Sequence, residues 1–222
     1  ILLSCDYSQV ELRLLAHLSE DPELMGAFHR DEDVHASTAA AILGIPLAEV
    51  TYEQRSLAKA INFGLMYGMS DFGLAARTDL SRDDARRFIE AYFGRFSRVK
   101  EYLDATIASA HQKGYVETVL GRRRYFPELR ATSGANPNVQ RAAERAAVNM
   151  PMQGSAADII KVAMIRLDRR LSEEGLRGGM LLQVHDELVL EVPQEEVERT
   201  VALVVDTMSN AYPLKVPLKV DT

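Results

Sequence analysis

The stretch MLLQVHDELVLEV, Met180 to Val192, decides the fold because it predicts two apolar strands joined by a tight polar turn. The strands are Met180 to Val184 and Leu188 to Val192, with His185 to Glu187 between them. A plain hairpin turn is one interpretation, since Asp is common in turns. A cation site is the other, because two adjacent carboxylates at a hairpin tip repel each other unless a cation lies between them.

A second carboxylate at a strand end comes from the start of the chain. The apolar run Ile1 to Leu3 leads into CDYSQVELR and predicts a strand, Ile1 to Asp6, followed by a helix. A carboxylate at the end of a buried strand costs free energy unless a cationic group or ion lies beside it. If this strand pairs beside the hairpin, Asp6 and Asp186 meet at the same edge of one sheet. Two ions of Mg²⁺, roughly 4 Å apart, suit such a carboxylate pair and would leave their other positions for water and phosphate oxygens.

The segment TYEQRSLAKAINFGLMYG, Thr51 to Gly68, predicts a helix with a capping box at Thr51 and a glycine terminator. Leu57, Ile61 and Leu65 form a stripe that can be buried. A second stripe recurs every four residues over about 18 Å and reads cation, cation, aromatic, aromatic. Its members are Arg55, Lys59, Phe63 and Tyr67.

This second stripe has two interpretations. An ordinary amphipathic helix would have solvated Arg and Lys side chains and a Phe in the core. A nucleotide site would use the two charges for a triphosphate and the flat rings for a base. Combined with paired carboxylates, the stripe favours the nucleotide site.

The charge distribution is uneven along the 222 residues, whose net charge is −6. Arg55 to Arg145 holds 16 Lys and Arg against 10 Asp and Glu, so the rest of the chain carries a balance of −12. This asymmetry suits a basic surface for phosphates backed by an acidic body, although a solvated mixture of charges would also produce it. The single cysteine fits a reducing cytoplasm, and no apolar run is long enough to span a membrane. The start of the chain, inside a strand and without Met, suggests a piece of a longer polypeptide.

The predicted strands cluster at both ends of the chain, with helices between them. This pattern indicates an α+β fold, a small antiparallel sheet carrying a large inserted helical subdomain. A hairpin is expected at Tyr115 to Val119 and Arg123 to Phe126, turning at Gly121, and a loop at ATSGANPN, 131–138. The remaining predictions are a strand at Leu214 to Val220 and helices at Pro22 to Arg30, Val34 to Leu43, Ser81 to Phe93, Val99 to Lys113, Val139 to Asn149, Ala156 to Leu171 and Gln194 to Ala211.

Three segments together resemble the polymerase domain of family A DNA polymerases, the bacterial DNA polymerase I type. DYSQVELR matches the first family motif, RSLAKAINFGLMYG the second (Arg-x₃-Lys-x₃-Phe-x₃-Tyr-Gly) and QVHDELVLEV the third, in the family's order. The resemblance covers essentially the whole chain. It implies a right-hand architecture with the thumb absent, with palm at 1–18 and 154–222 and fingers at 19–153.

The resemblance also implies a role for each matching residue. Asp6 and Asp186 would be the catalytic metal-binding aspartates, with the carbonyl of Tyr7 as a further ligand. Glu11 would be the steric gate against a 2′-hydroxyl, and Lys59 a catalytic acid for the leaving group. Nucleotide contacts would come from His35, Arg55, Lys59, Phe63, Glu11 and Tyr67. DNA contacts would come from Tyr67, Gly68, Arg145, Asn149, Gln153, His185 and Glu187.

The implied activity is template-directed DNA synthesis, adding dNTPs to a primer 3′-hydroxyl with two Mg²⁺ ions, for which Mn²⁺ is a substitute. The implied partners are a primed DNA template, a dNTP and the remaining N-terminal part of the same polymerase, in the cytoplasm and without a membrane. A DNA-binding fragment, inactive without its missing segments, is one alternative. A two-metal phosphodiesterase is another, although it has no use for the Arg55-x₃-Lys59-x₃-Phe63 stripe.

Overall fold

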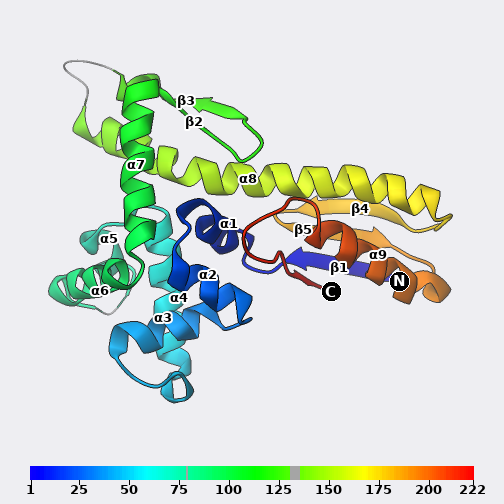
Figure 1. Cartoon of the computed structure of the whole chain (residues 1–222), viewed down its shortest axis with the longest axis horizontal. Helices are drawn as coiled ribbons and strands as arrows, with labels where there is room; N and C mark the ends of the chain where they lie inside the picture. The colour runs from blue at the N-terminus through cyan, green and yellow to red at the C-terminus, as the bar shows by residue number, and fades with distance from the viewer. Residues whose placement is uncertain (79, 131–135) are drawn as a thin grey trace. The chain divides into compact units, whose positions relative to one another are not determined.

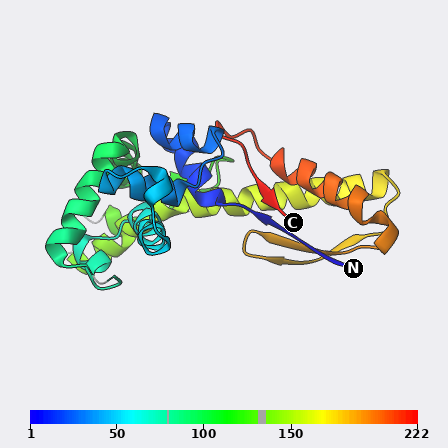
Figure 2. The same cartoon turned by 90° about the horizontal axis from the view of Figure 1, so that it is seen from below.

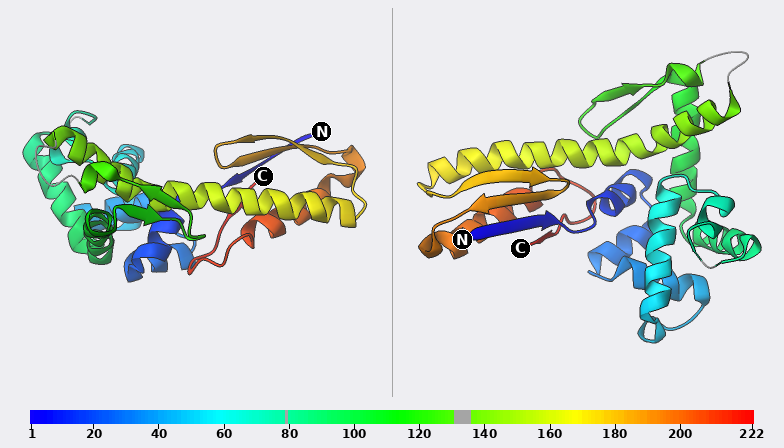
Figure 3. Two further views of the ribbon diagram at one scale, coloured as in Figure 1. Left: turned by 90° about the horizontal axis from the view of Figure 1, so that it is seen from above. Right: turned by 180° about the vertical axis from the view of Figure 1, so that it is seen from behind.

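The sheet that carries both chain-end segments has the strand order β4-β5-β1-β6, and its pairs are antiparallel. The strands are β1 (Leu2–Tyr7), β4 (Gly179–Val184), β5 (Glu187–Glu191) and β6 (Val220–Asp221). In the computed structural model, which describes residues 1–78, 80–130 and 136–222, the first strand therefore does pair beside the hairpin (Figure 3). The predicted α+β fold with a small antiparallel sheet is confirmed.

One face of this sheet is a core and the other is open. Alternate residues of β1 point inward, with Leu3 at 8%, Cys5 at 0% and Tyr7 at 1% exposure, because successive strand side chains point to opposite faces. Helix α9 (Val197–Ser209) and the C-terminal half of α8 (Pro137–Glu173) lie on that side (Figure 2). The Tyr7 hydroxyl donates to the Met208 carbonyl of α9 at 2.7 Å. Asp6, on the opposite face, is half-buried.

The chain divides into two units, 1–14 with 153–222 and 15–152. Two helices cross from one unit into the other, α1 (Val10–Ser19) and α8 (Pro137–Glu173). The second unit is mainly helical (Figure 1). Its elements are α2 (Pro22–His29), α3 (Val34–Leu43), η1 (Leu47–Glu49), α4 (Tyr52–Met66), α5 (Asp71–Ala75), α6 (Arg82–Arg95), α7 (Ser97–Lys113), β2 (Tyr115–Glu117), β3 (Arg123–Tyr125) and η2 (Pro127–Leu129).

Helix α4 begins and ends as its sequence predicts. The Thr51 hydroxyl accepts from the Gln54 amide, and the Gln54 side chain accepts from the Thr51 amide, which completes the capping box. Gly68, just beyond the end, has a left-handed φ of 71°. Ile61 and Leu65 are 1% and 2% exposed and Leu57 is half-buried, so the apolar stripe is confirmed.

Asp21 fixes the start of two helices in the second unit. One carboxylate oxygen accepts from the Glu23 and Leu24 amides at 3.1 Å and caps α2. The other oxygen accepts from the Arg98 amide at 3.2 Å, in the first turn of α7. The side chain is 1% exposed, so burial and hydrogen bonding combine to hold both helix ends in place.

The prediction of separate helices at Val139 to Asn149 and Ala156 to Leu171 is wrong, because α8 is one helix with Pro151 inside it. Pro151 removes one backbone donor, and Ser155 does not start a new helix. The parts of α8 before and after Pro151 are each stabilised by their own packing. Residues N-terminal to it join the core under the β2–β3 hairpin, and residues C-terminal to it are buried at helical spacing, namely Ile159, Ile160, Ala163 and Leu167.

Two further predictions need correction, and one short helix was not predicted. The strand expected at Leu214 to Val220 is reduced to β6, since Pro217 within that stretch and Pro213 just before it have no amide hydrogen for a ladder. The expected helix Gln194 to Ala211 is split into η3 (Gln194–Glu196) and α9. The short helix α5 was not expected, and its start is capped by Ser70.

The other predicted elements are present with ends that differ by a few residues, and the hairpin does turn at Gly121, where φ is 79°. Most of the predicted loop at 131–138 lies outside the described residues. Within the described part of the chain, no helix is both long enough and apolar enough to cross a membrane.

Candidate active site

The two strand-end aspartates of the first unit lie at the same edge of the sheet. Asp6 is paired with Glu187 across β1 and β5, one residue from the turn that holds Asp186. The Tyr7 amide donates to the Asp186 carbonyl at 3.2 Å, so the two aspartates are on adjacent chain segments. The predicted meeting of Asp6 and Asp186 at one edge is therefore confirmed.

The electrostatics of this edge show an excess of negative charge around Asp6. Burial raises the pKa of Asp6, and the nearby carboxylates of Asp186, Glu187 and Asp221 raise it further. Each of these effects disfavours the ionised form of Asp6. Asp221 on β6, directly opposite Asp6 in the ladder, was not expected from the sequence. Its position depends on a C-terminal strand pairing that the local pattern does not reveal.

The neighbours of these aspartates have different environments. The Tyr7 ring is buried in the core, so only the backbone of Tyr7 is available to a site at the sheet edge. His185 is exposed at the first turn position with a left-handed φ of 54°. The Ser4 hydroxyl donates to Glu187, which ties this carboxylate to the open face of the sheet. Glu11 is half-buried in the first turn of α1.

The donor set at the edge fits a hard divalent cation. It consists of carboxylate oxygens whose mutual repulsion a cation would relieve, and oxygen is the ligand atom that Mg²⁺ prefers. Across residues 1–78, 80–130 and 136–222, no group of three or more His, Cys, Asp or Glu side chains is arranged to enclose an ion by itself. Mg²⁺ in proteins commonly takes one or two carboxylates and completes its shell with water and substrate. The Cys5 thiol is no competitor, because burial raises its pKa to about 11.

The predicted nucleotide-site residues of the second unit gather on one side of α4. Phe63 and Tyr67 stack with ring centroids 6.4 Å apart, and the His35 ring of α3 lies 5.7 Å from Phe63. Lys59 is exposed, while Arg55, Phe63 and Tyr67 are half-buried. The charges of Arg55 and Lys59 both act on His35. The structure thus brings all five side chains to one face of the α3–α4 pair.

Arg55 has a partner that the sequence did not suggest. Its Nε donates to Asp33 Oδ2 at 2.5 Å, and the other Asp33 oxygen caps α3 by accepting from the His35 and Ala36 amides at 3.0 Å. Burial opposes ionisation of Asp33, but the hydrogen bonds from Arg55 and from the two amides hold its pKa below the usual range. The capping role of Asp33 was readable from its place before the helix. The ion pair depends on how α3 packs against α4.

The residues expected to touch DNA fall into two sets. In the second unit, Gly68 lies against Arg145 so closely that an added Cβ would be 3.3 Å from Arg145 Cγ. Arg145 is exposed and Asn149 is half-buried, one turn further along α8. Gln153 follows on the same helix, and His185 and Glu187 belong to the hairpin of the first unit.

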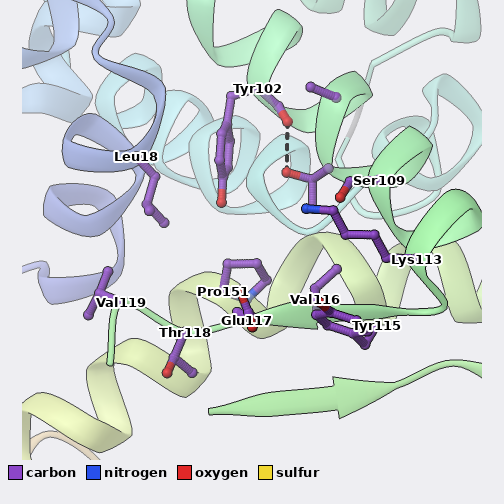
Figure 4. Close-up of a pocket in the computed structure, with 12 residues that line it drawn as sticks. Leu18, Tyr102, Ser109, Lys113, Tyr115, Val116, Glu117, Thr118, Val119 and Pro151 are labelled. Carbon is purple, nitrogen blue, oxygen red and sulfur yellow. Dashed lines mark hydrogen bonds between the residues drawn. The ribbon is translucent and has the colours of Figure 1, made fainter. Parts of the chain in front are cut away.

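An open cavity of about 320 Å³ lies elsewhere in the second unit, between α7 and β2 (Figure 4). Leu18, Tyr102, Lys113 and Pro151 are among its lining residues, and the Thr106 hydroxyl beside it donates to the Tyr102 carbonyl at 2.8 Å. None of the predicted site residues lines this cavity. The cavity is therefore separate from the candidate site.

The comparisons with known proteins agree with the motifs. The family model for DNA polymerase family A matches residues 1–222. The chain belongs to this family. It is 53% identical to DNA polymerase I of Bacillus caldotenax over 221 residues, 100% of this chain and 25% of that protein. It is 52% identical to DNA polymerase I of Mycobacterium bovis over 219 residues, 99% of this chain and 24% of that protein.

A comparison with a solved structure agrees with the family match. The chain resembles the POL domain of Pol1 from M. smegmatis, in complex with DNA primer-template and dNTP, with a TM-score of 0.94 and 50% identity. The match covers 99% of this chain and 38% of that one. The chain thus spans about a quarter of the length of the curated family A relatives named above.

Proposed function

We propose that this chain is the palm and fingers part of a polymerase that extends a DNA primer by template-directed nucleotidyl transfer. The palm would comprise 1–18 and 154–222, and the fingers 19–153. One observation carries the proposal: the Tyr7 amide to Asp186 carbonyl bond, which joins the two aspartate-bearing segments at one edge of the sheet. Membership of DNA polymerase family A supports it, as does the bound primer-template and dNTP of the M. smegmatis protein.

In this proposal Asp6, Asp186 and the carbonyl of Tyr7 would hold two Mg²⁺ ions, or Mn²⁺ in their place. When bound, the ions would supply Lewis-acid charge that lowers the pKa of the primer 3′-hydroxyl and balances charge on the pyrophosphate. The repulsion among Asp6, Asp186, Glu187 and Asp221 supports a cation at this place. Glu187 and His185, at the same hairpin, would lie near the primer end.

The α3–α4 face would bind the incoming nucleotide. Arg55 and Lys59 would pair with the triphosphate, and Lys59 would give a proton to the pyrophosphate as its bond to the α-phosphate breaks. Phe63 would stack on the base and sugar, and Glu11 would exclude a 2′-hydroxyl by occupying its space. Stacking of Phe63 on Tyr67 supports an aromatic platform at this face.

The DNA contacts would extend along α8 and the end of α4. Tyr67 and Gly68 would meet the template base, and Arg145, Asn149 and Gln153 would meet the new pair from its minor groove. Minor-groove acceptors lie in similar places in every base pair, so donors there test pair shape rather than sequence. The close approach of Gly68 to Arg145 supports a shared surface for these two residues.

The test is dNTP incorporation on a primed template by the complete natural protein that carries this chain, with Mg²⁺ titrated from zero. Asp186→Asn should abolish extension while DNA binding in a gel-shift assay is retained, because only the metal-dependent chemistry is removed. Asp168→Asn, an exposed carboxylate on α8, is the matched control and should extend normally. Extension by Asp186→Asn would refute the proposal. Shortening of the primer would favour a phosphodiesterase, and binding without any chemistry would favour a DNA-binding role.

A further inference from the structure

A buried polar cluster joins α3 to α4 directly behind the proposed nucleotide face. Its members are His35, Thr38 and Asn62, which are 3%, 0% and 1% exposed. The Asn62 amide nitrogen lies 2.9 Å from His35 Nδ1 and 3.1 Å from Thr38 Oγ1. Buried polar side chains are expected to be hydrogen-bonded, and here Asn62 joins both of the other two.

The donors in this cluster can be assigned from the chemistry of each group. The Thr38 hydroxyl has two acceptors within reach, the Val34 carbonyl at 2.7 Å and Asn62 Oδ1 at 3.3 Å. It donates its one hydrogen over the shorter distance, to Val34, and accepts from the Asn62 amide nitrogen. The Asn62 amide nitrogen has two hydrogens and no lone pair to offer. One hydrogen goes to Thr38 Oγ1 and the other to His35 Nδ1. His35 Nδ1 is therefore the acceptor, and the neutral ring carries its hydrogen on Nε2.

The surroundings keep this ring neutral. Burial lowers the pKa of His35 to about 4; Asp33 opposes this change, and the cations Arg55 and Lys59 reinforce it. At neutral pH the ring therefore has one donor, Nε2–H. Asn62 occupies Nδ1, so Nε2–H is the donor left for a ligand. The tilted contact with Phe63, at 44° between ring planes, places the His35 ring beside the proposed base platform.

We infer that Asn62 and Thr38 are positioning residues that hold His35 as a neutral Nε2–H donor for a phosphate of the incoming nucleotide. The inference rests on the proposed function, since it deepens the role of His35 in that site. Arg55 and Lys59 already supply two positive charges. A neutral N–H donor gives a phosphate oxygen a directional hydrogen bond. It does so without adding a third positive charge, which would repel the other two.

The first experiment measures the His35 tautomer in the complete natural protein without DNA or nucleotide. The ¹³C shift of His Cδ2 distinguishes an Nε2–H ring from an Nδ1–H ring, and the missing signal of His35→Gln assigns it. The expected result is Nε2–H at pH 7, changed to Nδ1–H or to the doubly protonated ring in Asn62→Asp, whose carboxylate can only accept. An Nδ1–H ring in the unsubstituted protein would overturn the inference without any variant.

The second experiment measures dNTP incorporation with kcat and KM determined separately. Asn62→Ala should raise the dNTP KM roughly tenfold, the size of one lost hydrogen bond to a charged group, with a smaller change in kcat. Asn62→Asp should make KM depend on pH between about 6 and 8, because an adjacent carboxylate raises the pKa of a histidine toward that range. Thr38→Val should act in the same direction as Asn62→Ala but more weakly.

The control is Thr106→Val, which removes a hydroxyl that donates to a carbonyl one turn back, as Thr38 does. It should change neither KM nor the His35 signal. A merely structural role for Asn62 predicts lower thermal stability with a pH-independent KM, and that result would refute the inference. The two proposals fail differently: an unsubstituted protein that incorporates no dNTP defeats the proposed function, whereas an altered tautomer with unaltered KM defeats only the positioning role.

Discussion

Asp6 and Glu187 lie directly opposite each other in the β1–β5 ladder, and Asp221 is opposite Asp6 on the other side. A neutral residue at position 6 would be electrostatically easier for the fold, since like charges that face each other across strands are destabilising. With Asp6 ionised, the fold is therefore less stable than it would be with a neutral residue at position 6, and the sheet edge carries an oxygen-rich, anionic site. Such a conflict between folding and charge is typical of functional positions.

Asp6→Asn should stabilise the metal-free protein at neutral pH. The pKa of Asp6 is raised in the folded state, so its contribution to stability is present below the unfolded-state pKa and is lost as pH rises through the folded-state value. Above that window the charged form opposes folding by at most about 1 kcal/mol, since the group is only half-buried. Urea unfolding in a chelator at pH 7 and at about pH 3 measures this.

The stabilisation should disappear at the lower pH, where Asp6 is protonated in both states and resembles Asn. Asp168→Asn serves as the control at both values. Equal stability of Asp6→Asn and the unsubstituted protein at pH 7 would mean that the carboxylates at this edge do not repel each other appreciably.

Glu11→Ala should relax sugar selection in the complete natural protein. The half-buried side chain would no longer fill the space of a 2′-hydroxyl, so the ratio of kcat/KM for dNTP over NTP should fall roughly tenfold or more. Glu198→Ala, a first-turn glutamate of α9, controls for the loss of a carboxylate at a helix start. An unchanged ratio would remove the steric-gate role from Glu11 and leave the rest of the proposal intact.

Asp33 should show two separable contributions to stability. Asp33→Ala removes both the α3 cap and the Arg55 ion pair and should cost about 1 kcal/mol at pH 7. Asp33→Asn keeps a capping oxygen and loses only the half-exposed ion pair, so it should cost less than about 0.5 kcal/mol.

The pH dependence of Asp33 has the opposite sign to that of Asp6. Its pKa is lowered in the folded state, so its stabilisation is present above the unfolded-state pKa and is lost as pH falls through the folded-state value. Unfolding curves from pH 7 down to about 2.5 should therefore bring Asp33→Asn and the unsubstituted protein together. A gap that persists in acid would show that the ion pair is not its source.

Gly68→Ala should destabilise the second unit more than Gly121→Ala. Both glycines have left-handed φ, 71° and 79°, so both substitutions incur the same backbone strain of about 1 kcal/mol. Only at Gly68 would the new Cβ also crowd a neighbour, Arg145, while Gly121 has open space around it. Thermal unfolding of the two variants isolates the crowding, and equal losses would mean that Arg145 moves aside freely.

Local chemistry predicted the parts of the fold that depend on a few neighbouring residues. The capping box of Thr51 and Gln54 and the left-handed Gly68 gave the two ends of α4 from short-range rules. The same rules failed at Ser155, which has the pattern of a helix start but lies inside α8. There the burial of apolar residues on both sides of Pro151 outweighs the local signal, and burial is a property of the tertiary structure.

The candidate site divides in the same way. From the sequence, Asp6 and Asp186 meet only if the first strand pairs beside the hairpin, and the β1–β5 ladder meets that condition. Asp33 and Asn62 could not be assigned partners, since their contacts with Arg55 and His35 depend on the rotation of α3 against α4. The spacing of apolar residues along a helix predicts which face of the helix is buried. It does not predict which residues of the neighbouring helix that face will contact.

The double role of Asp21 has a consequence for how the second unit tolerates change. A glutamate there would be one methylene too long for either helix start, and an asparagine could offer only one accepting oxygen to three amides. Variation in α2 and α7 is therefore coupled through a single position. Any shift in the origin of α7 would be passed along its 17 residues to the β2–β3 hairpin at its far end.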